Sequence, residues 1–425
     1  MVRRLSVIGL AGVLLLTGCL PGADGEDETE LVEEEEDEHV YTPTPTINAP
    51  EGYYRNVLQD GKYQRSPARG SVSDSMNNRV DVDQFEMGLM EIASAHFSQE
   101  DYFFRDGQLL SGGVINSWLR RLGPYSDNER IGSRYVSGLN PSLYTEEELE
   151  YNDAVNRGEE VDENPDLAVD PSEWSMEEEE QRMKDNPAFL SHIMEHNYMV
   201  QDGEESVALG GIVIGMGMRH TYTFSITDDE TGRIHSFEES LDPEEVEAAT
   251  RQRAQIVLNR LRSHDDIDED TPIVIALYQE QRRNSLVPGS FVSVARSDSG
   301  VELGNWETLD EDHYLFPSSR ASENRRDHAD AFSAFKNEVE DFFDHAIGIV
   351  GKGRYKSGDL QEFRVELNMQ SHGKAEIIAL TQHLSGLKQE YLAFDAPVKI
   401  YLESVTGTEA IVVTYPGEEP FVHIH

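Results

Sequence analysis

The sequence predicts an α+β fold, in which helices pack on mainly antiparallel sheets and the mature domain holds two successive helix-and-strand segments. Three observations lead to this prediction. Several segments alternate apolar and polar residues and are joined by short turns, which is typical of hairpins. Amphipathic segments with a helical period lie between them. The order helix, strands, helix, strands occurs again toward the C-terminus, although the two segments do not form a sequence repeat.

The chain begins with the features of a lipoprotein signal peptide. Two arginines near the start form a positive n-region, and residues 5–16 form an apolar run that is shorter than a membrane span of about 20 residues. Two small residues, Thr17 and Gly18, precede Cys19, the only cysteine of the chain. We predict a signal peptide at residues 1–18, cleavage before Cys19, and a diacylglyceryl thioether on its thiol. A buried free cysteine would not explain the arginines, the run length and the small residues together.

Residues 19–50 are expected to form a disordered tether. Eleven Asp and Glu residues lie between positions 24 and 38 with no intervening base, and a Thr/Pro string follows at residues 42–46. Such a segment cannot bury enough apolar surface to fold, and its charge and proline content keep it extended. The folded domain is then expected at residues 51–425, with sub-segments 51–320 and 321–425.

Composition limits the kinds of partner. The chain has 35 Lys and Arg against 82 Asp and Glu, which gives a formal net charge of −47. This charge repels phosphate backbones, so we exclude nucleic acid as a partner. With a single cysteine, the mature protein has no intramolecular disulfide, and once that cysteine is acylated it has no thiol nucleophile or thiolate metal site.

The first folded segment combines a helix with a charged excursion. Phe85, Leu89, Met90, Ala93 and Phe97 recur at helical spacing and predict a core-facing stripe. Residues 145–180 are rich in acids, and we expect an exposed excursion, part helix and part loop, rather than a cation site.

A strand at residues 211–218 is the best-marked element of the sequence. Its even positions are Ile212, Ile214, Met216 and Met218, whereas its odd positions are mostly glycine. Glycines on one face mean that something packs close against the backbone. A helix is the ordinary candidate, and a ligand that faces Gly211, Gly215 and Gly217 is the alternative. The strand is expected to continue to residue 226 and to return as a hairpin at residues 234–237.

A helix with a clear start follows this hairpin. Asp242 is placed to cap it, Pro243 suits the first helical position, and Glu245 has the spacing of a capping box. An apolar stripe then runs from Val246 to Leu261. A buried strand is expected at residues 272–278, followed by strands and turns at residues 291–295 and 314–316.

The second segment repeats this order of elements. An aromatic helix face lies between residues 332 and 346, and it is a core face rather than a binding groove. Strands are expected at residues 362–369, a helix at residues 375–391, and paired strands at residues 398–402 and 410–414 joined by a turn at Thr406 and Gly407.

One short motif raises the question of catalysis. His192, Glu195 and His196 have the H-x-x-E-H order of inverted zinc peptidases, in which two histidines one helical turn apart share a metal and the glutamate activates water. The alternative is that these are ordinary polar positions on a helix that starts after Pro187, and we favour it because the motif is short. The sequence has no G-x-S-x-G elbow and no Walker A string. We therefore predict no catalytic residues, no metal and no cofactor.

Strings spread along the chain resemble the CamS family of Gram-positive lipoproteins, which are described as sex-pheromone precursors. They are the signal with its Leu-Thr-Gly-Cys end and residues 138–141, 211–218, 287–291, 306, 314–317, 363–378 and 381–382. The resemblance covers nearly the whole chain. It implies a membrane-anchored lipoprotein, but it assigns no role to the large mature domain, which we expect not to be an enzyme because the one catalytic motif is weak.

The resemblance also implies a released peptide. In that family the pheromone is a short hydrophobic peptide cut from the end of the signal sequence. Carried onto this chain, it comprises Gly12, Val13, Leu14, Leu15, Leu16, Thr17 and Gly18. This peptide is mostly leucine with a terminal glycine, which departs from an active pheromone, so membership does not carry pheromone activity with it.

The expected location is the extracellular face of the cell membrane. Its partners there are membrane lipid, through diacylglyceryl Cys19, and the lipoprotein processing enzymes. As an alternative function, the mature domain is an extracytoplasmic binding module for a peptide, a cell-wall fragment or a surface protein.

Overall fold

The computed structural model describes residues 39–47, 52–70, 76, 78–124, 130–131, 134–135, 138–228, 231–342, 347–369 and 373–425. From Val40 onward the chain forms one compact unit. Within the described ranges, no helix combines the length and the hydropathy that a membrane span requires.

A small antiparallel sheet opens the domain. It consists of β1 (Tyr41–Pro43), β2 (Val57–Gln59) and β3 (Lys62–Tyr63). The Tyr41 amide donates to the carbonyl of Glu205, and the Arg105 guanidinium lies 5.7 Å from the Tyr41 ring. The sequence placed residues 41–43 in the disordered tether, which is wrong for these three residues, because strand pairing and the Tyr41 contacts order them.

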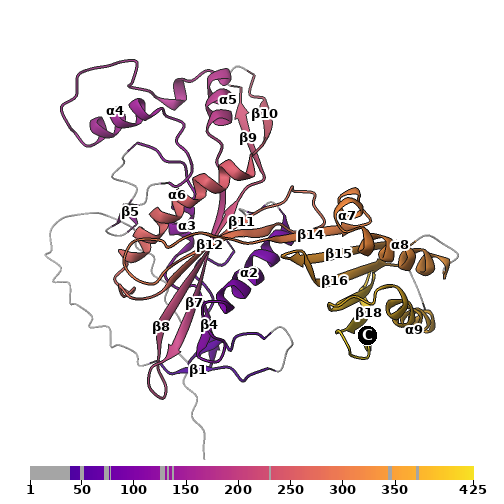
Figure 1. The fold of residues 1–425 in the computed structure, drawn as a ribbon. Helices are drawn as coiled ribbons and strands as arrows, with labels where there is room; N and C mark the ends of the chain where they lie inside the picture. Colours follow the sequence, from indigo (N-terminus) through magenta and orange to yellow (C-terminus); the bar gives the residue numbers. More distant parts are fainter. Residues whose placement is uncertain are drawn as a thin grey trace, which may run out of the picture. The chain divides into compact units, whose positions relative to one another are not determined.

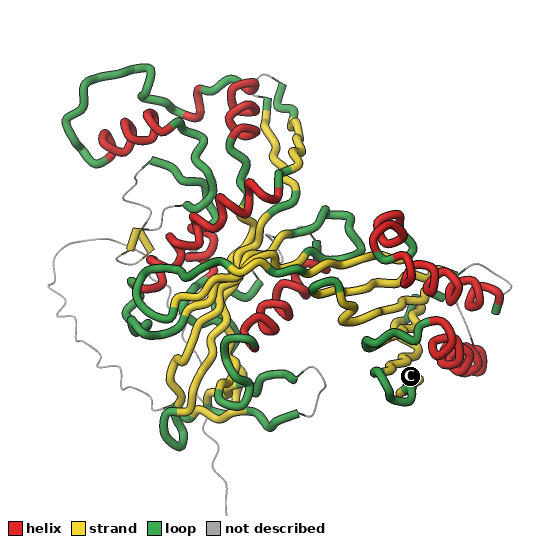
Figure 2. Tube along the Cα trace, viewed as in Figure 1, coloured by secondary structure: helices red, strands yellow, loops and turns green. Residues whose placement is uncertain are grey.

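The first large sheet has the strand order β13-β12-β11-β8-β7-β4 (Figures 1 and 2). Its strands are β4 (Tyr102–Asp106), β7 (Leu190–Gln201), β8 (Val207–Met218), β11 (Ile273–Gln279), β12 (Ser290–Ser297) and β13 (Glu307–Thr308). Only β8 and β11 are parallel, and α6 (Pro243–Arg262) connects them. The predicted cap is confirmed, because the Asp242 carboxylate accepts from the amides of Glu244 and Glu245.

Helices cover both faces of this sheet. α2 (Arg79–Ser94) packs on one face, where Phe85 and Leu89 meet Val213. On the other face, α6 and the short α3 (Gly112–Trp118) pack against Ile212, Ile214 and the other even-numbered apolar residues of β8. The alternation that predicted β8 is therefore confirmed, and both of its faces are buried.

The acidic excursion is exposed, as expected. It contains α4 (Glu146–Asn156), the 3-10 turn η2 (Pro171–Glu173) and α5 (Met176–Asp185). Thr145 and Glu148 form a capping box at the start of α4, and Arg182 of α5 pairs with Glu148 at 2.8 Å. The hairpin of β9 (Thr221–Thr227) and β10 (Ile234–Ser240) forms a separate sheet. The predicted hairpin is confirmed, but its first strand does not continue β8. A second short hairpin pairs β5 (Arg130–Ile131) with β6 (Arg134–Tyr135).

The second large sheet has the order β14-β15-β16-β17-β18-β19. Its strands are β14 (Glu311–Phe316), β15 (Gly348–Lys356), β16 (Asp359–Asn368), β17 (Val398–Ser404), β18 (Gly407–Thr414) and β19 (Phe421–Ile424). Because β14 belongs to this sheet, the expected division at residue 320 lies too late in the chain. The link between the two large sheets is the two-residue stretch after β13, Leu309 and Asp310.

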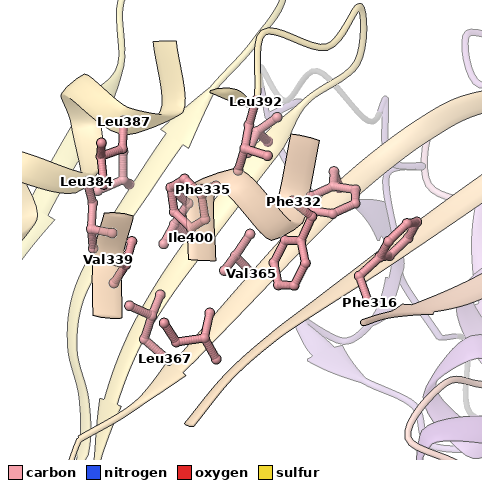
Figure 3. Packing of buried hydrophobic residues seen from close by; sticks show 14 of the residues in the cluster. Phe316, Phe332, Phe335, Val339, Val365, Leu367, Leu384, Leu387, Leu392 and Ile400 are labelled. Carbon is pink, nitrogen blue, oxygen red and sulfur yellow. The ribbon is translucent and has the colours of Figure 1, made fainter. Parts of the chain in front are cut away.

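One face of the second sheet carries its core (Figure 3). α8 (Arg326–Asp341) and α9 (Lys374–Tyr391) both lie on this face, next to the short α7 (Ser319–Asn324). Phe332 and Phe335 of α8 pack near Val365 and Ile400 of the strands. Burying such an aromatic ring contributes about 2 kcal/mol to folding. The predicted core face is confirmed for Phe332, Phe335 and Val339, but Phe342 follows the end of the helix and is 40% exposed.

The two large sheets share one connection pattern. β7, β8, α6, β11 and β12 follow the same order and the same antiparallel, parallel, antiparallel pairing as β15, β16, α9, β17 and β18. The predicted α+β class is confirmed, with mainly antiparallel pairing and one parallel pair in each large sheet.

Candidate functional site

The H-x-x-E-H motif lies on strand β7, next to the edge strand β4 of the first sheet, and the predicted helix after Pro187 is wrong. Neighbouring strand residues point to opposite faces, so His192 and His196 face the α2 side while Glu195 faces the other. β7 pairs with β8 along most of its length and with β4 from His196 to Val200, and its motif side chains are buried, so this tertiary setting overrides the local pattern. Among the described residues, no group of three or more His, Cys, Asp or Glu side chains is arranged to hold a metal.

Glu195 anchors the loop that precedes α3. Its carboxyl oxygens accept from the amides of Gln108, Leu109 and Leu110 at 3.2, 3.1 and 2.8 Å, and from Asn197 Nδ2 at 2.7 Å. Burial raises the pKa of Glu195, and these hydrogen bonds oppose the rise. The side chain therefore fixes the segment that leads into α3.

His192 and His196 are core residues. The His196 ring meets Phe104 edge-on at 4.9 Å, and His192 meets Phe85 at 6.1 Å. Burial lowers the pKa of each imidazole to about 4. Both are therefore neutral at pH 7.

Side chains fill the space over the glycines of β8. A Cβ atom on Gly211 would lie 2.2 Å from Phe97 Cε1, and one on Gly215 would lie 2.7 Å from Phe85 Cζ. A Cβ on Gly217 would lie 2.7 Å from the Ser191 hydroxyl. The interpretation of these glycines as a ligand-facing strand is thus corrected. α2 and the Phe97 that follows it pack against Gly211 and Gly215, because bare backbone is what lets the two aromatic rings approach the sheet.

A small hollow of about 90 Å³ lies beside the H-x-x-E-H residues, and a larger groove of about 660 Å³ lies between α2 and the second sheet. We call the larger one the α2 groove. One wall is the outer face of α2 with the chain around Gly52, and the other comes from β15 and the first residues of β16 and β17. Its lining residues are Gly52, Tyr53, Tyr54, Gln84, Met87, Gly88, Met90, Glu91, Ser94, Gln99, Arg354, Gln361, Glu362, Pro397, Lys399 and Tyr415.

α2 divides its side chains between the core and the groove. Phe85, Leu89 and Ala93 are fully buried against the first sheet. Met87 is 45% exposed, and it lies on the opposite side of the helix with Glu91 and Ser94, as the spacing of three or four residues requires. A large apolar side chain is thus presented to the groove.

The charged residues of the groove are paired with one another. Arg354 Nε lies 2.6 Å from Glu311 Oε1, and its Nη2 lies 2.5 Å from Glu91 Oε2. Lys399 Nζ lies 2.6 Å from Glu362 Oε2 on the other side. Burial would raise the pKa of Glu311, but the neighbouring His313 and Arg354 outweigh it and lower that pKa. The charges in the groove wall are therefore neutralised internally.

Buried polar contacts position the N-terminus of α2. Asp81 accepts from the Tyr278 hydroxyl at 2.8 Å and from the Gly289 amide at 2.6 Å. The Asn78 side chain caps α2 and also donates to the carbonyl of Ser285. A Cβ on Gly289 would lie 1.9 Å from the Gln279 carbonyl oxygen, so only glycine fits there. Gly289 belongs to residues 287–291, one of the strings on which the family resemblance rests.

The predicted processing residues fall outside the described residues. These are Cys19, Gly18 and the rest of the peptide Gly12–Gly18. The groove residues carried no motif, and Met90 was assigned to the apolar core stripe. The available signal was weak: Met87 lies off the stripe of Phe85, Leu89 and Ala93, as an apolar residue on an otherwise polar face.

Comparisons with known proteins agree on one family. A family model described as CamS sex pheromone cAM373 precursor matches residues 63–420. A crystal structure of a sex pheromone precursor from Lactobacillus salivarius subsp. salivarius UCC118 is similar with a TM-score of 0.71 and 26% identity, covering 90% of this chain and 98% of that one. The C-terminal domain of the sex pheromone staph-cAM373 precursor from Staphylococcus aureus is similar with a TM-score of 0.61 and 25% identity, covering 83% of this chain and 98% of that one. A search of curated proteins finds no match.

Proposed function

This chain belongs to the CamS sex pheromone precursor family, and from that membership we propose that it is an exported lipoprotein held at the outer face of the cell membrane through Cys19. The positive n-region, the short apolar run and the small residues before Cys19 support this proposal. Two acyl chains anchor a protein stably where one does not, so a diacylglyceryl group is sufficient.

The second part of the proposal is that processing releases a peptide. Cleavage before Cys19 leaves the signal fragment, and a further cut yields residues 12–18. Family membership supports release of the peptide. We do not extend pheromone activity to it, because its sequence is mostly leucine.

The mature domain is proposed to be a binding module rather than an enzyme. The observation that carries this proposal is the α2 groove, a hollow of about 660 Å³ lined by apolar, aromatic and amide side chains together with the paired charges of Glu91, Arg354, Glu362 and Lys399. Ligand sites are typically concave and about 300–1,000 Å³ in volume. The residues of the H-x-x-E-H motif are used for packing and loop anchoring, which removes the main argument for catalysis.

Acyl labelling tests the anchor. In a Gram-positive host fed an alkyne-tagged fatty acid, the wild-type chain should carry the label, and Cys19→Ala should carry none and remain at precursor size. Ser6→Ala, a change in the same signal segment, should be labelled like the wild type. Equal labelling of Cys19→Ala would contradict the proposed anchor.

A further inference from the structure

The α2 groove fits one class of ligand. We propose that it binds an extended peptide with no charged side chains, and that residues 12–18 of this chain, once released, are the peptide it binds. This inference rests on the proposed function, since the peptide must first be cut from the signal sequence.

The apolar part of the groove suits leucine side chains. Met87 and Met90 line it from α2, and Tyr53 lines it from the preceding loop. Methionine side chains are flexible and polarizable, so they adapt to apolar side chains of varied shape. Tyrosine adds a large contact area at a low cost in conformational entropy. Residues 14–16 of the peptide are three consecutive leucines.

The charges of the groove select against charged ligands. Arg354 and Lys399 are already paired with Glu91, Glu311 and Glu362. A charged ligand side chain would have to compete with those pairs, and the net charge of −47 disfavours acidic ligands further. Residues 12–18 carry no charged side chain, so they require no change in these pairs.

The groove also offers hydrogen bonds to a peptide backbone. Gln99 and Gln361 line it, and a side-chain amide provides both donors and acceptors. An extended peptide presents the same two kinds of group at every residue. The amides therefore complement the backbone, while the methionines contact the side chains.

The dimensions agree with the leucine part of the peptide. α2 lines the groove from Gln84 to Ser94, which corresponds to a length of about 16 Å. Five extended residues span roughly 17 Å. A peptide that runs along the outer face of α2 would thus place its three leucines against the helix, with its ends beyond the lined stretch.

Binding of a synthetic peptide tests the inference. A dye-labelled peptide with the sequence of residues 12–18 is titrated into residues 20–425, the mature chain without its acylated cysteine, and fluorescence anisotropy is measured. We expect saturable binding with a micromolar Kd. Met87→Glu should weaken it at least about tenfold, and so should a peptide carrying Leu15→Asp.

Ile378→Glu is the matched control. Ile378 is 40% exposed on α9, outside the groove, and Met87 is 45% exposed on α2. This variant should bind like the wild type, and thermal unfolding checks that both variants are folded. Absence of saturable binding up to millimolar peptide would overturn the inference, as would binding that Met87→Glu leaves unchanged.

Mass spectrometry of the culture medium separates this inference from the proposed function. Release of residues 12–18 together with failed binding would overturn the groove assignment alone. If the synthetic peptide binds but cells release no such peptide, the proposed release is overturned. The peptide is then not the natural ligand of the groove.

Discussion

Acidification from pH 7 to pH 4 should destabilise the domain through His192 and His196, by about 3 kcal/mol for each residue. Burial lowers both pKa values to about 4 from the ordinary value of 6.5. In the unfolded chain the imidazoles take up protons as the pH falls through 6.5, whereas in the folded domain they do so only near pH 4. The stability that the two neutral histidines contribute to the folded domain is therefore fully present above pH 6.5, and it is lost as the pH falls toward 4.

Urea unfolding between pH 7 and pH 4.5 measures this effect. His196→Leu removes one titrating group and should show a shallower loss of unfolding free energy than the wild type. His235→Leu, on the exposed strand β10, is the control and should keep the wild-type slope. Equal slopes for the wild type and His196→Leu would show that His196 does not titrate as a buried group.

Glu195→Ala should reduce the free energy of unfolding by about 4 kcal/mol, because several buried donors lose their acceptor at once. The amides of residues 108–110 and Asn197 Nδ2 all donate to this carboxyl group. Glu195→Gln keeps one acceptor oxygen, so it should reduce the free energy of unfolding by about half as much as Glu195→Ala.

Denaturant unfolding at pH 7 distinguishes the structural role from a catalytic one. Glu204→Ala removes an exposed carboxylate close by in the sequence and should leave the midpoint unchanged. A midpoint for Glu195→Ala within the error of the wild type would contradict the assigned role. A catalytic glutamate would be expected to cost activity rather than this much stability.

Local signals in the sequence were sufficient for several elements. The alternation in β8 follows from burial of one set of side chains, and the start of α6 follows from Asp242 and Pro243. In both cases the pattern that predicts the element lies within the element itself or directly before it. The glycines of β8 also indicated close packing correctly, and the structure identifies Phe85 and Phe97 as the packed groups.

Features that depend on distant contacts could not be predicted in this way. Polar side chains on β7 are buried because their hydrogen-bond partners come from distant segments. Glu195, for example, accepts from the amides of residues 108–110. The α2 groove joins Glu91 to Arg354, which are separated by 263 residues. The periodicity of each segment does not indicate that the two segments are in contact. The groove could therefore not be predicted from the sequence.

Hydrogen–deuterium exchange tests the central claim most directly, namely that the mature domain binds the released peptide in the α2 groove. Residues 20–425 are compared with and without saturating synthetic peptide of residues 12–18. The account predicts slower exchange in α2 and at the start of β16 and β17, with little change in the hairpin of β9 and β10. Unchanged exchange in α2, or protection confined to other elements, would contradict it.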